Sequence, residues 1–185
     1  MIESRFKEAE DRMNKAVDAL RKDLATLRAG RANPSLLEKI SISYYGVPTP
    51  INQVANISAP EARLLVVQPW DRSILPDIER AILKSDLGLT PSSDGSIIRI
   101  NIPQLTQERR MELVKTAKKK TEEARVAVRN IRRDLIEEIK AIEKKGEITE
   151  DQLRKGQEQM QKLTDKFIET VDKVLASKEA EIMEV

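Results

Sequence analysis

The sequence predicts an α+β protein in which a long helical bundle is interrupted by a smaller β-containing unit. Three observations predict this class. Ala, Glu, Lys, Leu and Arg together make up 86 of the 185 residues, a proportion typical of long helices. All eight prolines lie between Pro34 and Pro103. Apolar residues recur at helical spacing outside that window and alternate as in strands inside it.

The two flanks, residues 1–29 and 106–185, are predicted to be helical because proline is excluded from helix interiors. The first flank carries one apolar seam and the second carries two, with steps of mostly three and four. The seams consist of Ile2, Phe6, Ala9, Met13, Ala16, Leu20, Leu24 and Leu27; of Val114, Ala117, Thr121, Ala124, Val128, Ile131, Leu135, Ile139 and Ile142; and of Leu153, Met160, Leu163, Phe167, Val171 and Val174. Three stripes of similar period predict a three-helix bundle.

Helix ends are also readable in the flanks. Gly30 is predicted to be the C′ residue of the first helix, and Gly146 ends the second helix in the same way. Thr149 and Gln152 fit a capping box that starts the third helix, preceded by Ile148 as a hydrophobic staple. The short turn around Gly146 predicts that the last two helices are antiparallel neighbours.

Residues 30–105 are expected to form a separate unit that mixes strands and one helix. Its seven basic residues balance seven acidic ones. The expected elements are a half-buried strand through Ile40, Ile42 and Tyr44, a turn-rich break over residues 45–50, a central strand over residues 64–67, a helix capped by Ser73 that buries Ile78, Ile82 and Leu83, and a strand through Ile98, Ile100 and Ile102.

Two short connections join this unit to the flanks, one over residues 29–34 and one over residues 102–106. If they lie side by side, they can act as a two-stranded hinge between two rigid bodies. A fixed corner without functional motion fits the same sequence.

The composition excludes the common classes of enzyme. The chain has neither cysteine nor histidine, which rules out disulfides, thiolate and imidazole metal sites and nucleophiles activated by histidine. Gly-rich phosphate-binding loops and serine-hydrolase motifs are missing as well. We therefore predict no catalytic residues, no metal and no cofactor. The acid-rich start is no signal peptide and no apolar run could span a membrane, so a cytoplasmic protein is expected.

The net charge of +2 hides a basic segment. Residues 106–140 hold eleven basic and seven acidic side chains, whereas residues 141–185 hold eight and eleven. At about 100° per residue, one arc of about 100° on this helix collects four arginines and a lysine, beside the core seam. These residues are Lys118, Arg125, Arg129, Arg132 and Arg133, with Lys115 at the edge and Glu122 as the one acid among them.

Like charges crowded in this way repel one another, and a polyanion commonly offsets that cost. Arginine adds bidentate phosphate contacts and stacking on unpaired bases, so the arc indicates a polyanion, with RNA as the favoured one. A solvated face that only keeps the protein soluble is the other interpretation.

Five motifs resemble the bacterial ribosome recycling factor family, in order and over essentially the whole chain. They are Leu-Arg-Ala-Gly-Arg-Ala-Asn-Pro-Ser-Leu-Leu at 27–37, Tyr-Tyr-Gly-Val-Pro-Thr-Pro at 44–50, Ser-Asp-Leu-Gly-Leu at 85–89, Leu-Thr-Gln-Glu-Arg-Arg at 105–110 and Glu-Ala-Arg-Val-Ala-Val-Arg-Asn-Ile-Arg-Arg at 123–133.

The resemblance implies an L-shaped two-domain monomer whose three-helix bundle carries a β/α/β sandwich inserted through a hinge. It implies a translation factor that binds the post-termination ribosome on 23S ribosomal RNA of the large subunit. Together with elongation factor G and GTP, such a factor splits the ribosome and releases messenger RNA and deacylated transfer RNA. A coiled-coil adaptor or chaperone is the alternative, and salt-sensitive binding would discriminate the two.

The resemblance also assigns roles to single residues. Arg129, Arg132 and Arg133 match the family's RNA-binding arginines. Arg28 and Arg31 flank the hinge glycine, and Arg31 is expected either to face RNA or to anchor the hinge by an ion pair. The matched hinge positions are Gly30, Arg31, Pro103, Gln104 and Leu105.

Overall fold

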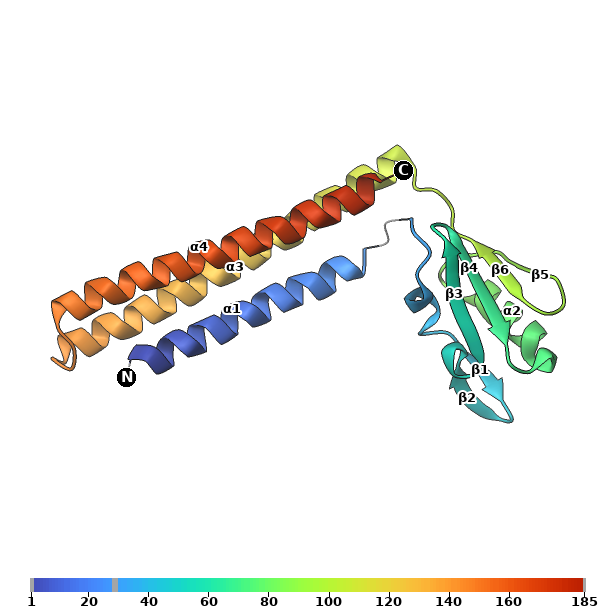
Figure 1. Ribbon diagram of the computed structural model, residues 1–185, viewed down its shortest axis with the longest axis horizontal. Coiled ribbons are helices and arrows are strands. Elements are labelled where there is room, and N and C mark those ends of the chain that lie inside the picture. The colour runs from blue at the N-terminus through green and yellow to red at the C-terminus, as the bar shows by residue number, and fades with distance from the viewer. Residues whose placement is uncertain (1, 28–29, 185) are drawn as a thin grey trace. The chain divides into compact units, whose positions relative to one another are not determined.

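The computed structural model describes residues 2–27 and 30–184. The chain forms two compact units, one made of residues 1–29 and 107–185 and the other of residues 30–106. Figure 1 shows the three helices of the first unit running side by side: α1 (Ile2–Ala25), α3 (Gln107–Lys144) and α4 (Glu150–Met183). The predicted α+β class and three-helix bundle are confirmed.

The core of the bundle is built from the predicted seams. Met13 and Leu20 on α1, Val128 and Leu135 on α3 and Met160 on α4 are all buried in one apolar cluster. Each apolar side chain removed from water contributes about 1.5–3 kcal/mol, so these interlocking seams account for much of the stability of the bundle.

The predicted end of α3 and the predicted start of α4 are confirmed, but the predicted end of α1 is not. Gly146 has φ +77°, its N–H donates to the Glu143 carbonyl, and the next N–H donates to Ile142, which together make a Schellman cap. Thr149 and Gln152 form the predicted capping box. The prediction for Gly30 is wrong, because α1 already ends at Ala25 in a tight turn through Thr26.

The smaller unit contains two antiparallel sheets and a helix. Strands β3 (Ala55–Glu61), β4 (Leu64–Pro69), β5 (Pro91–Ser93) and β6 (Ile98–Asn101) form one sheet in the order β3-β4-β6-β5. Strands β1 (Ser41–Tyr44) and β2 (Val47–Pro50) form a separate hairpin. The helix α2 (Leu75–Lys84) follows β4, and short 3₁₀ turns cover residues 34–37, 51–53 and 72–74.

Strand β4 is central, as predicted, but one expectation needs correction and two strands were missed. Residues 47–50 form β2 rather than a break, and β3 and β5 were not predicted. The register pairs Tyr44 with Val47 across a two-residue turn, so the nitrogens of Pro48 and Pro50 face away from β1 and no ladder bond is lost.

The start of the helix also differs from the prediction. Ser73 is not its cap: the N-cap of α2 is Ile74, which makes no side-chain cap hydrogen bond. Asp71 caps the preceding 3₁₀ turn, because its carboxylate accepts the Ser73 N–H at 2.9 Å and the hydroxyl at 2.7 Å. Ile78 and Ile82 are fully buried, whereas Leu83 is 55% exposed. The core lies on the inner face of the four-stranded sheet, which packs Leu65, Val67, Ile98 and Ile100 against the helix and the hairpin.

Candidate nucleic-acid interface

Helix α3 carries the predicted arc of basic side chains along the face next to α4. The core positions Ala124, Val128 and Ile131 are buried and fix the rotation of the helix. The basic side chains therefore lie at the boundary between the core seam and solvent, where those nearest α4 reach its polar side chains.

Arg125 is held by the protein itself. Its Nε and Nη2 donate to Oδ1 of Asp172 on α4 at 2.9 and 2.7 Å, and its Nη1 donates to Glu122 at 2.9 Å. The hydrogen bond with Asp172 is the main reason that the pKa of Arg125 is raised. Only 22% of the side chain is exposed. Arg125 therefore ties α3 to α4, and its predicted contact with RNA stays a prediction.

Arg129 and Arg132 are held more loosely. Arg129 is 42% exposed and lies 3.4 Å from Glu122, which it shares with Arg125. Arg132 donates to the neutral side-chain oxygen of Gln161 on α4 at 3.0 Å. Because an amide carries no charge, this contact orients the guanidinium without neutralising it.

Arg133 and Lys118 are exposed, and neither makes an ion pair with the part of the chain that the structure describes. We call Lys118, Arg129, Arg132 and Arg133 the α3 basic patch. It spans about 22 Å at 1.5 Å per residue. Glu122 is the one carboxylate among these residues, and its hydrogen bond with Arg125 lowers its pKa and keeps it ionised. The patch thus retains a net positive charge.

The remaining predicted RNA contacts are not on this helix. Arg28 lies outside the described residues, and Arg31 is an exposed residue at the start of the smaller unit. The sequence analysis missed the two partners on α4, Gln161 of Arg132 and Asp172 of Arg125. No local pattern marks them, because they are far from α3 in sequence and meet it only through helix packing.

The predicted hinge residues form a small cluster at the edge of the smaller unit. Gly30 has φ +75°, and a Cβ at this position would lie 3.0 Å from Cγ of Leu105. The N–H groups of Ala32 and Ile102 donate to the carbonyls of the adjacent residues Ala62 and Arg63. The entering and leaving segments therefore lie side by side and are fixed to the same turn.

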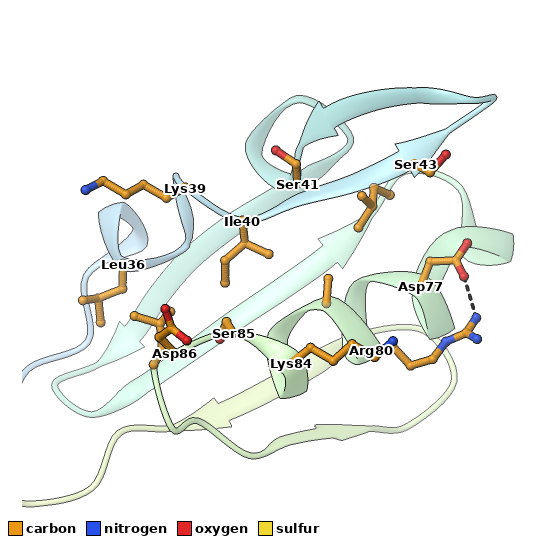
Figure 2. Close-up of a pocket in the computed structure, with 13 residues that line it drawn as sticks. Leu36, Lys39, Ile40, Ser41, Ser43, Asp77, Arg80, Lys84, Ser85 and Asp86 are labelled. Carbon is orange, nitrogen blue, oxygen red and sulfur yellow. Dashed lines mark hydrogen bonds and ion pairs between the residues drawn. The ribbon is translucent and has the colours of Figure 1, made fainter.

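A concave region lies in the smaller unit, between β1 and α2. It is an open groove of about 770 Å³. Figure 2 shows Asp77 and Arg80 paired on α2, where Arg80 donates to the carboxylate at 2.6 Å, with Lys84 farther along the helix. The groove also holds Asp86, so its charges are mixed and it offers no basic excess comparable with that of α3.

Comparison with known proteins decides the family. A model of the family described as "Ribosome recycling factor" matches residues 20–183. The chain belongs to the ribosome recycling factor family. The resemblance predicted from the five motifs is confirmed.

Relatives and solved structures agree over the full length. The ribosome-recycling factors of Heliobacterium modesticaldum and Moorella thermoacetica are 64% and 65% identical over all 185 residues of this chain and all of theirs. The solution structure of a ribosome recycling factor, 46% identical, matches with a TM-score of 0.74 over 100% of this chain and 98% of that one.

A second solved structure matches with a TM-score of 0.64 and 43% identity over all of both chains. It is described as models for the T. thermophilus ribosome recycling factor and the E. coli elongation factor G bound to the E. coli post-termination complex. Among the described residues, no helix combines the length and apolar character needed to cross a membrane.

Proposed function

We propose that this chain recycles ribosomes after termination by binding 23S ribosomal RNA of the large subunit through the α3 basic patch. With elongation factor G and GTP, it then splits the ribosome into subunits and releases messenger RNA and deacylated transfer RNA. The factor acts as a monomer in the cytoplasm and has no catalytic site, metal or cofactor of its own. The related factor described with elongation factor G on a post-termination complex supports this proposal.

The observation that carries the RNA contact is the uncompensated charge at Arg132 and Arg133. Arg132 has only a neutral partner, and Arg133 makes no ion pair within the described part of the chain. Guanidinium groups held on a packed helix can meet phosphates at little entropic cost, and each contact releases counterions. Binding should therefore weaken steeply with added salt, unlike the binding of an adaptor through apolar faces.

Splitting the ribosome requires free energy from GTP hydrolysis, which this chain does not supply. The sequence has no nucleotide-binding motif, so the GTPase is the partner. We infer that elongation factor G pushes the smaller unit and that the segments around Gly30 and Leu105 act as the hinge. Their common attachment at Ala62 and Arg63 would make the two segments move together with the smaller unit.

A sucrose-gradient assay of post-termination ribosomes with the factor, elongation factor G and GTP tests the proposal. The wild-type protein should convert ribosomes to subunits, and omission of any component should prevent it. The double variant Arg132→Ala/Arg133→Ala should split poorly at limiting concentration and recover at high concentration, because binding is its defect. Arg154→Ala on α4, where the arginine is paired with Asp151, is the matched control and should behave as wild type.

Two results would contradict the proposal. Failure of the wild-type protein to release subunits under any of these conditions would exclude recycling. Equal splitting by the double variant at every protein and salt concentration would exclude the α3 basic patch as the RNA contact.

A further inference from the structure

The outer face of the four-stranded sheet carries an exposed polar surface that the proposed function does not use. Along β3, β4 and β6, side chains alternate between the buried inner face and the outer face. The outward side chains of Asn56, Gln68 and Arg99 are exposed. A four-stranded antiparallel sheet with one open face is the type of platform on which several RNA-binding modules stack bases.

Trp70, the single tryptophan of the chain, stands at the end of this surface, directly after β4. Its side chain is 71% exposed, although its backbone is fixed by a hydrogen bond from its N–H to the Val54 carbonyl at 3.2 Å. The indole is left in water at the end of the strand instead of being packed in the core. The indole is therefore an exposed aromatic face on a held backbone, available for a planar group to stack on.

A hollow of about 480 Å³ lies beside this indole and is lined by Asn56, Gln68, Pro69, Trp70, Arg72 and Ser96. Its volume falls in the range of roughly 300–1,000 Å³ that is common for small-ligand sites. Asn56 and Gln68 are direct cross-strand partners, and both line the hollow. Arg72 is exposed and makes no ion pair within the described residues.

The chemistry of this lining selects among possible partners. It contains one cation and no carboxylate, and apart from Trp70 and Pro69 it is polar. A protein partner would be expected to meet an apolar pocket that receives an anchor side chain. A nucleotide instead needs a ring to stack on, amides for the edge of a base and a cation for the phosphate, and the lining offers each of these.

We propose that the hollow beside Trp70 binds an unpaired nucleobase of single-stranded RNA. The base stacks on the indole, the amides of Asn56 and Gln68 hydrogen-bond to its edge, and Arg72 contacts the adjoining phosphate. This site lies in the smaller unit and is separate from the α3 basic patch. It would hold a flexible RNA strand even if the contact through α3 proved wrong.

The single tryptophan makes the site directly observable. Full-length protein is titrated with oligoadenylate of about ten nucleotides while Trp70 fluorescence is recorded. A parallel titration with duplex RNA of the same length serves as the comparison. Single-stranded RNA should quench the fluorescence with saturation, whereas the duplex should quench it little because its bases are already stacked. The double variant Arg132→Ala/Arg133→Ala should keep this quenching, which separates the site from the proposed ribosome contact.

Variants in that double-variant background show whether Trp70 contributes affinity. Fluorescence anisotropy of a labelled oligoadenylate should report binding roughly 5- to 150-fold weaker for Trp70→Leu and a smaller loss for Trp70→Phe. Arg72→Ala should weaken binding and lower its salt dependence. Tyr45→Asn is the matched control, because it removes a side chain that is 85% exposed at a residue with φ +49°, where asparagine is tolerated.

Several outcomes would overturn the inference. These are no quenching by single-stranded RNA, equal quenching by the duplex, or unchanged affinity in a folded Trp70→Leu protein. Quenching by elongation factor G but not by RNA would assign the surface to a protein contact instead. If Trp70→Leu does not fold, Trp70→Phe and Arg72→Ala decide the question, and unchanged affinity in both would reject the site.

Discussion

Arg125 on α3 and Asp172 on α4 are joined by two hydrogen bonds to one carboxylate oxygen, from Nε at 2.9 Å and from Nη2 at 2.7 Å. Arg132, two turns further along the same face, meets only the neutral Gln161. The two arginines look equivalent in sequence, but the structure gives them different partners. The carboxylate of Asp172 pairs with Arg125 across the two helices, whereas the partner of Arg132 leaves its charge unneutralised.

We predict that Arg125→Ala destabilises the bundle by about 1 kcal/mol. The substitution removes the contacts between α3 and α4 and leaves Asp172 without its partner. Urea unfolding followed by far-UV circular dichroism measures the effect, with Arg154→Ala as the control for loss of an exposed arginine. Equal midpoints for the two variants would show that the contact with Asp172 contributes no stability.

Arg132→Ala and Arg133→Ala should weaken binding and leave stability unchanged. Each should leave the unfolding midpoint nearly unchanged, because neither side chain fills the core. Each should reduce the slope of log affinity for large subunits against log salt by close to one, as expected for the loss of one phosphate contact. Binding measured over a salt series tests this. A collapsed thermal melt for either variant would assign that residue a structural role.

Gly30→Ala should destabilise the smaller unit by about 1–2 kcal/mol, because φ +75° disfavours a side chain and its Cβ would press against Leu105. Thermal unfolding followed by Trp70 fluorescence reports this unit. Gly88→Ala is the matched control, because it has φ +67° but open space around its Cβ. We expect a smaller loss for Gly88→Ala. Equal losses would mean that the contact with Leu105 is unimportant.

Asp94 should stabilise the smaller unit at neutral pH and lose this effect in acid. The N–H groups of Ile97 and Ser96 donate to its carboxylate, and these hydrogen bonds hold its pKa well below the usual range. A lowered folded-state pKa gives stability that is present above the unfolded-state pKa and declines as the pH falls toward the folded-state value.

Asp94→Asn keeps the turn geometry but removes the charge, so it should melt below wild type at pH 7. The two melting temperatures should converge between about pH 5 and pH 2, with Trp70 fluorescence as the probe. A difference that stays constant over this range would show that the charge of Asp94 is not the cause.

The sequence alone predicted the features that depend on residues close together in the chain. The seam through Met13 and Leu20 and the capping box of Thr149 and Gln152 require only spacings of three and four residues on one helix. The basic arc on α3 could be placed beside the core seam for the same reason. These features follow from helix geometry, which each segment carries with it.

Strand β3 and the pairing of Arg125 were decided by the tertiary structure. Residues 55–61 contain Ala, Asn, Ser and Pro and have little strand propensity of their own, and they are extended because they pair with β4. Asp172 lies 47 residues from Arg125 in sequence. The register between α3 and α4, set by packing along the whole core seam, brings them together. An interaction between distant segments depends on how their cores pack, and no spacing within either segment records it.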